Sequence, residues 1–177
     1  MKSLKESILS RSSHSSETAK NMILIEEWLK QYNIKNYTIK DNFEIDVDEG
    51  VNLYRSDIVE FPPYIQFGIV QGYFLCDGDG LISLRGCPKK VEGYFNCSNN
   101  NLTSLEGSPV EVDGYFDCSN NQLITLKGGP VEVDGYFDCS LNKLTSLKGA
   151  PKKVGGDFLC SHNTKRFTKK DIKNEIA

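Results

Sequence analysis

The sequence lacks the segments that carry a chain into or across a membrane. No apolar run approaches the roughly 18 residues that span a bilayer as a helix. The opening Met-Lys-Ser-Leu-Lys-Glu also lacks the apolar stretch of a secretory signal. These two absences predict a cytoplasmic protein without a membrane-spanning part.

Motifs for catalysis, metals and cofactors are also scarce. The chain has two histidines, His14 and His162, which lie far apart, and no cysteine pair with Cys-x-x-Cys spacing. It shows no Ser/His/Asp grouping and no glycine-rich phosphate loop. The Asp-Gly-Asp-Gly stretch at 77–80 suggests a calcium loop only superficially, because it lacks the ligand series of an EF-hand. We therefore predict a non-enzymatic protein with no metal and no cofactor.

An excess of basic residues is missing as well. Lys and Arg number 21 against 24 Asp and Glu, which gives a formal net charge of -3. Binding to phosphates depends on a concentrated excess of Lys and Arg. The charge balance therefore argues against nucleic acid as the main ligand.

What the chain has in abundance is a repeat of 21 residues. The segment Gly-Tyr-Phe-Leu-Cys at 72–76 returns in related form at 93–97, 114–118, 135–139 and 156–160. A fixed period of this size predicts a solenoid, in which each coil buries its apolar edge against the next. Five of the six cysteines share one repeat position, which suits a small apolar side chain. We interpret them as reduced, buried thiols, with disulfides between neighbouring coils as the alternative.

Each position of a coil has a predicted role. Phe95 and Cys97 lie two residues apart, so in a strand they share one face. Leu102 and Leu105 are expected to point inward from the opposite side. Asn100 sits at a turn, where an inward amide can bond backbone groups that the strand leaves unpaired. Stacking converts these positions into ladders of Phe74, Phe95, Phe116, Phe137 and Phe158, and of Asn100, Asn121, Asn142 and Asn163 with Asp79 in the first rung.

This repeat resembles a known family. Its core reads Phe95-x-Cys97-x-x-Asn100-x-Leu102 and recurs from residue 74 to 147. It resembles the short leucine-rich repeats of bacterial and bacteriophage proteins, in which L-x-C-x-x-N-x-L replaces the commoner L-x-L-x-x-N-x-L. The resemblance implies a leucine-rich-repeat-like β-solenoid of parallel, stacked short strands that serves as a binding scaffold. The opening Lys-Ser-Leu-Lys-Glu-Ser-Ile-Leu looks like phage-encoded members of this group.

The residues before the repeat form two segments. Residues 1–20 are polar and rich in serine, which predicts a flexible segment. Within residues 21–50, apolar residues at 3-4-3 spacing predict a helix over 21–32. Two short alternating runs around a turn at 41–42 then predict a β-hairpin. Helix and hairpin together are expected to cap the first coil.

The predicted fold class is α+β, with the solenoid over residues 51–164. Residues 165–177 form a C-terminal tail or cap. Thr168 and Asp171 have the spacing of a capping box, which predicts a short final helix ending near Ile176.

The outward positions of the strands give the candidate site. If Phe95 and Cys97 point inward, Tyr94 and Asn96 point outward. Repetition then yields a tyrosine column and a neighbouring column with acids, and a third, acidic column follows if the strand extends back before the glycine. The columns contain acids but no Lys or Arg, although stacked like charges are destabilising. The predicted partner-binding residues are Tyr73, Tyr94, Tyr115, Tyr136, Glu92, Asp113, Asp117, Asp134, Asp138 and Asp157.

Two interpretations of these columns are open. Tyrosine supplies rigid contact area and the acids select a basic patch, so the columns suit recognition of a protein with a basic surface. Alternatively, Tyr and Asp are soluble residues copied by repeat duplication. An acidic surface of this kind repels nucleic acid, but it can mimic nucleic acid and compete for a protein's groove.

Three functional classes follow from these expectations. The resemblance implies a phage or bacterial interaction module that binds, and inhibits, a host macromolecule such as a CRISPR-type defence nuclease in the host cytoplasm. The alternative is a structural or assembly protein that self-associates through its solenoid ends. An enzyme is the least supported class, because a flat, regular ladder offers no pocket that raises a carboxyl pKa.

Overall fold

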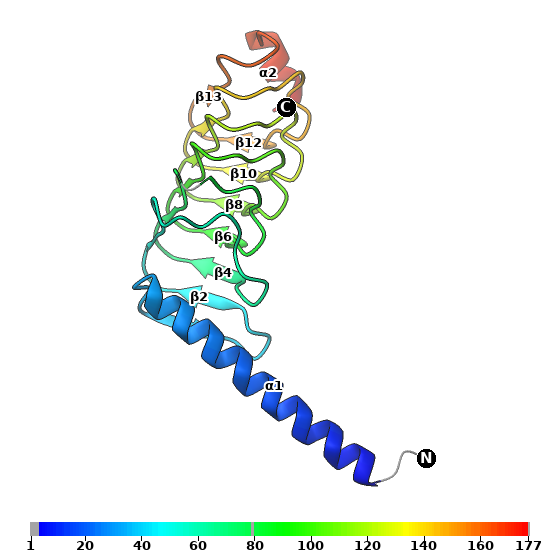
Figure 1. Ribbon diagram of the computed structural model, residues 1–177. Coiled ribbons are helices and arrows are strands. Elements are labelled where there is room, and N and C mark those ends of the chain that lie inside the picture. Colours follow the sequence, from blue (N-terminus) through cyan, green and yellow to red (C-terminus); the bar gives the residue numbers. More distant parts are fainter. Residues whose placement is uncertain (1–3, 79, 177) are drawn as a thin grey trace.

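The computed structural model describes residues 4–78 and 80–176, with side chains from residue 17 onward. These residues form a β-solenoid with helix α1 at one end and helix α2 at the other (Figure 1). The elements are α1 Leu4–Gln31, β1 Tyr37–Ile39, β2 Ile45–Val47, β3 Val51–Asn52, β4 Phe67–Val70, β5 Phe74–Leu75, β6 Lys90–Val91, β7 Phe95–Asn96, β8 Glu111–Val112, β9 Phe116–Asp117, β10 Glu132–Val133, β11 Phe137–Asp138, β12 Lys153–Val154, β13 Phe158–Leu159 and α2 Lys169–Glu175.

Two sheets run along the solenoid in the described part of the chain. The first sheet has the strand order β1-β2-β4-β6-β8-β10-β12, and the second has the order β13-β11-β9-β7-β5-β3. Successive coils pair in parallel with equivalent residues opposite each other, as Phe95 lies opposite Phe116. The predicted solenoid of short parallel strands is confirmed.

Each coil turns a corner between its two strands at a glycine. β6 ends at Val91 and β7 begins at Phe95, with a bend between them. A Cβ atom on Gly114 would lie 2.7 Å from the carbonyl oxygen of Gly93, so neighbouring backbones approach too closely for a side chain. One strand running through this glycine, which the third outward column assumed, does not form.

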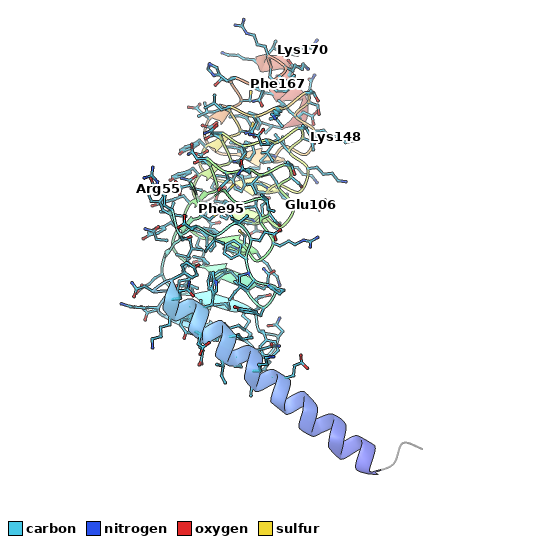
Figure 2. All side chains as sticks on the ribbon, viewed as in Figure 1. Arg55, Phe95, Glu106, Lys148, Phe167 and Lys170 are labelled. Carbon is cyan, nitrogen blue, oxygen red and sulfur yellow. The ribbon has the colours of Figure 1, made fainter. Side chains whose placement is uncertain are left out.

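The core is a column of phenylalanines flanked by leucines and cysteines. Consecutive rings from Phe74 to Phe158 stack with centroids 5.1 to 5.7 Å apart. Figure 2 shows Phe95 within the stack, whereas Glu106 and Lys148 project from it. Each buried Phe or Leu contributes roughly 1.5–3 kcal/mol relative to an exposed one.

The asparagine ladder connects neighbouring coils through their backbones. Oδ1 of Asn100 accepts hydrogen bonds from the N–H groups of Gly80 and Leu81, both at 2.9 Å. Its Nδ2 donates to the carbonyl oxygens of Cys76 at 2.8 Å and Cys97 at 3.1 Å. Each amide thus bonds its own coil and the preceding one, which confirms the predicted role. The pattern recurs at Asn121, Asn142 and Asn163.

Helix α1 is longer than the sequence pattern predicts. The pattern predicts a helix over 21–32 after a flexible segment, but α1 begins at Leu4, so residues 4–20 are helical instead. Buried Trp28 and Leu29 fix the last turns against the first coils. Once those turns are fixed, each further residue adds one hydrogen bond without a new nucleation cost. The helix therefore extends through the serine-rich part and projects from the solenoid (Figure 1).

The predicted hairpin is confirmed and belongs to the first sheet. Strands β1 and β2 pair antiparallel, with Ile39 opposite Ile45. Strand β2 then pairs in parallel with β4 as β3 does with β5, so β2 and β3 form one coil and β1 extends the first sheet by one strand beyond the coils.

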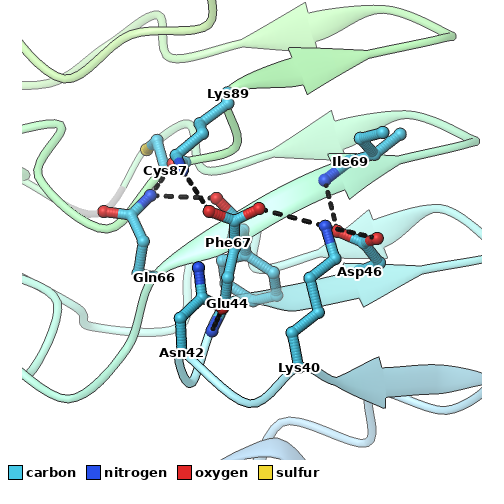
Figure 3. A network of polar contacts seen from close by, with 9 residues as sticks. All are labelled: Lys40, Asn42, Glu44, Asp46, Gln66, Phe67, Ile69, Cys87 and Lys89. Carbon is cyan, nitrogen blue, oxygen red and sulfur yellow. Dashed lines mark hydrogen bonds and ion pairs between the residues drawn. The ribbon is translucent and has the colours of Figure 1, made fainter.

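A network of charged side chains joins the hairpin to the first coils (Figure 3). Buried Glu44 accepts from Lys89 and, at 3.1 Å, from Lys40. Lys40 also lies 2.9 Å from Asp46, which accepts the backbone N–H of Ile69 at 2.9 Å. Lys89 and Lys40 hold the pKa of Glu44 below its ordinary value, against the effect of burial. The carboxylate therefore stays charged and paired between the hairpin, β4 and the loop before β6.

The C-terminal end is covered less completely. The predicted capping box is confirmed: Thr168 donates its N–H to Asp171 at 2.8 Å, and Thr168 Oγ1 accepts the N–H of Asp171 at 3.2 Å. In the last coil, however, Phe158 and Cys160 are only half-buried, and Leu159 is exposed. The rungs before it are fully buried at the Phe position, so burial of the core decreases at this end.

Removal of one ladder amide should destabilise the solenoid strongly. We expect Asn100→Ala to lower the free energy of unfolding by about 3 kcal/mol, because buried backbone groups of two coils lose their partners. Urea denaturation followed by circular dichroism measures this change. The neighbouring exposed Asn101 is the matched control, and Asn101→Ala should cost less than about 1 kcal/mol. Equal losses in the two variants would contradict the role of the ladder.

Candidate functional site

The four repeat tyrosines form a second aromatic ladder outside the core. Centroids lie 5.3 Å apart between Tyr73 and Tyr94, and 4.6 Å apart in the next two pairs, up to Tyr136. The planes of neighbouring rings differ by 16° or less. Stacked rings cover one another's faces, so the column presents ring edges and hydroxyl groups to the solvent.

The hydroxyls of Tyr115 and Tyr136 stay protonated at physiological pH. Burial first, then the neighbouring Tyr136 and Tyr94 and nearby Asp117, raise the pKa of Tyr115 to about 12. Burial, Asp117 and Asp138 also raise the pKa of Tyr136. These two tyrosines therefore offer O–H groups that can donate and accept hydrogen bonds beside carboxylates.

The two aspartates beside the tyrosines have a structural contact that the sequence pattern did not reveal. Oδ1 of Asp117 accepts the backbone N–H of Ser119 at 2.8 Å, and Asp138 accepts that of Ser140 at 2.8 Å. The equivalent Asn96 makes the same turn bond at 2.9 Å without a charge. The turn bond therefore uses a side-chain oxygen and no charge, and the coils with Leu75 and Leu159 at this position turn without it.

The acid at 117 is electrostatically unfavourable. Burial raises the pKa of Asp117, and the neighbouring Asp138 raises it further, although hydrogen bonds from Ser119 act in the opposite direction. Both effects disfavour the charged form in the folded protein.

The remaining acids lie apart from this pair. Glu92, Asp113 and Asp134 lie at the corner between the two sheets, and all three are exposed. Lysines outside the predicted columns reach two of them: Lys90 lies 3.7 Å from Asp113, and Lys153 lies 2.9 Å from Asp134. The expected continuous strip of unpaired acids is therefore not present.

The two lysines also neutralise a column of the first sheet that sequence reasoning missed. Lys90, Glu111, Glu132 and Lys153 follow one another across four strands. Each lysine lies 3.5 Å from its neighbouring glutamate. The residues before each repeat valine would have shown this column, because they read Lys, Glu, Glu, Lys in order.

We call the remaining surface the tyrosine–aspartate strip, and it lies along the second sheet. Asp157 stands at the tyrosine position of the last coil and is exposed. The strip comprises Tyr73, Tyr94, Tyr115, Tyr136, Asp117, Asp138 and Asp157.

The cysteines are free thiols and, with one exception, buried. Cys160 is the half-buried member, and burial raises its pKa, so it is a neutral thiol at physiological pH. In the described residues, no group of three or more His, Cys, Asp or Glu side chains is arranged to hold a metal ion. The calcium-loop stretch at 77–80 includes Asp79, which lies outside the described residues, as does that rung of the asparagine ladder. No described helix has the length and apolarity needed to cross a membrane.

Removal of the charge at 117 should stabilise the protein. Because the folded-state pKa of Asp117 is raised, the folded protein holds this proton more tightly, so stability falls as pH rises through the carboxyl range. We expect Asp117→Asn to raise the free energy of unfolding by about 1 kcal/mol near neutral pH, because it keeps the turn bond. The gain should disappear near pH 3, where the acid is protonated. Urea denaturation across this pH range measures both effects.

The reverse substitution is the matched control. Asn96→Asp should lower stability near neutral pH by a similar amount, because it places a third carboxylate beside Asp117. A stabilisation by Asp117→Asn that does not change with pH would contradict the electrostatic explanation.

Comparisons of the chain with protein-family models, with curated proteins and with solved structures give no significant match.

Proposed function

We propose that this protein is a non-enzymatic interaction module that binds a basic surface of another protein through the tyrosine–aspartate strip. One observation carries the proposal: aspartates stand at 117 and 138, although Asn96 at the equivalent position of another coil makes the same turn bond without a charge. The charge of Asp117 is disfavoured by burial and by Asp138. Retention of a destabilising charge that the fold does not need is typical of a binding surface.

The geometry of the strip suits a protein partner. Four stacked rings form a rigid surface, so little side-chain entropy is lost when a partner binds. Protonated tyrosine hydroxyls beside Asp117 and Asp138 offer donors and acceptors in fixed positions. The carboxylates attract Lys and Arg and increase the rate of encounter with a basic surface.

The same geometry argues against direct nucleic-acid binding. Single-stranded nucleic acids bind proteins by stacking bases on open aromatic faces. The faces of Tyr94 and Tyr115 are both covered by neighbouring rings. The aspartates beside them repel phosphates.

Removal of the strip charges should weaken partner binding without unfolding the protein. We expect Asp117→Asn with Asp138→Asn to reduce capture of the partner from a bacterial lysate about tenfold, because two charge pairs are lost. Mass spectrometry of proteins retained on the wild-type and variant baits measures the change, followed by dissociation constants for the purified partner at low and high salt.

The control carries the same change of net charge elsewhere. Glu60→Gln with Glu106→Gln alters two exposed acids outside the strip, and capture should remain at the wild-type level. Equal capture by wild-type and strip variant, or equal losses in both double variants, would refute the proposed site.

Self-association through the C-terminal end is a second candidate, favoured by the incomplete cover there. Leu141 and Leu159 are 52% and 42% exposed, and both line a hollow of about 900 Å³ beside Phe167. If this candidate is correct, the protein sediments as a dimer or larger species at high concentration, and Leu159→Lys restores the monomer. A wild-type monomer at every concentration in sedimentation equilibrium would exclude it.

Phage origin and inhibition of a defence nuclease, which the family resemblance implies, stay predictions. A partner identified as a nucleic-acid-binding protein would connect the strip to that role.

A further inference from the structure

The tyrosine ladder ends differently at its two ends. At the start, the ring of Tyr73 covers Gly50: a Cβ atom on that glycine would lie 2.6 Å from the ring. At the other end, the inner face of Tyr136 stacks on Tyr115 at 4.6 Å, and the next coil has Asp157 at the tyrosine position. No further aromatic ring of the described residues stacks on the outer face of Tyr136.

The exposed fraction of Tyr136 and the sequence before Asp157 both indicate that the outer face of the Tyr136 ring is open for stacking. Tyr136 is 36% exposed, whereas the three tyrosines before it are half-buried. The two residues before Asp157 are glycines, so no side chain of theirs fills the space above the ring. A planar group of the size of a tyrosine ring therefore has access to this face.

Two other rings, exposed Tyr54 and half-buried Phe167, each carry a cation. The guanidinium of Arg55 lies 5.0 Å from the ring centroid of Tyr54, and the ammonium of Lys165 lies 5.2 Å from that of Phe167. No Lys or Arg of the described part of the chain lies over Tyr136 in this way.

The charges around the outer face have the sign that a cation requires. Asp157 occupies the equivalent position in the next coil, and Asp138 lies in the adjacent column. Neither carboxylate forms an ion pair with a described residue, whereas the nearby Asp134 is paired with Lys153 at 2.9 Å. Two unpaired carboxylates therefore flank an aromatic face.

We propose that the outer face of Tyr136, with Asp157 and Asp138, is a binding site for an arginine side chain of the partner. This inference rests on the proposed function for the nature of the partner, but the site is defined by its own geometry. A guanidinium is planar, stacks on tyrosine and bonds carboxylates with two parallel N–H groups. It takes the place of a fifth ring in the ladder. A lysine ammonium carries the charge but cannot stack as a plane, so it binds more weakly.

The test uses the full-length protein and a short probe. The probe is acetyl-Gly-Arg-Gly-amide, titrated at constant ionic strength and followed by NMR. We expect the ring signals of Tyr136 to shift, and the arginine side-chain protons next to the guanidinium to move upfield because they lie over a ring. The isosteric citrulline peptide, which lacks the charge, should give neither change, and the lysine peptide should bind about two- to tenfold more weakly.

Variants at 157 separate stacking from charge. Asp157→Tyr should abolish the response, because a fifth tyrosine occupies the site. Asp157→Asn keeps the space open and should weaken binding about two- to tenfold. Asp48→Asn removes an exposed acid elsewhere and should leave binding unchanged. The thermal midpoint of each variant shows that the fold is retained.

Three results would overturn the site: no response to the arginine peptide, an equal response to the citrulline peptide, or an undiminished response in Asp157→Tyr. The proposed function fails separately. If the peptide binds as expected but the variant with Asp117→Asn and Asp138→Asn captures the partner as well as the wild type does, the arginine site is supported and the strip is not the partner interface.

Discussion

This protein depends on one constraint: the backbones of successive coils pair in parallel, with each residue opposite its own equivalent one repeat away. Because the register is constant, each repeat position has the same position of the next coils as its neighbour above and below. For Phe95 this arrangement is favourable, since identical rings stack on both of its faces, with centroids 5.7 and 5.1 Å away. For Asn100 it is also favourable, because an amide both donates and accepts, so one side chain serves two coils. The interior is built from these two side-chain types with flanking leucines, cysteines and valines.

The same constraint is unfavourable for charges, and the chain responds differently on its two sheets. On the first sheet, Lys90 and Lys153 enclose Glu111 and Glu132, so each glutamate has a lysine on one side. On the second sheet, Asp117 lies beside Asp138 with no lysine in the column, and its pKa is raised. Lysines pair with the acids of the first sheet and with Asp113 and Asp134 at the corner, but not with the described acids of the strip. For this reason the strip, and not the corner acids, is the candidate interface.

The repeat made the interior positions predictable from the sequence, but it did not make the contacts between neighbouring columns predictable. Phe95, Cys97 and Asn100 could be assigned because a period of 21 residues brings each position to the same place in every coil. The bend at Gly93 was missed, because a glycine within an alternating run is compatible with one long strand or with a corner. The pairing of Lys153 with Asp134 was missed for the related reason that it joins residues 19 apart in sequence, and so depends on the register between coils. The length of α1 was missed because local composition does not show that its final turns are anchored.

Repeat positions at which the residue type changes carry more information about function than positions at which it is the same in every coil. An unbroken ladder offers a partner the same environment at each coil, so it supplies contact area but no fixed register along the solenoid. A single interruption supplies that register. Asp157 in place of tyrosine leaves one open face, on Tyr136, and sets a carboxylate beside it. In the proposed complex, the uniform part of the strip would attract a basic surface, and the interruption would fix where along the solenoid that surface is held.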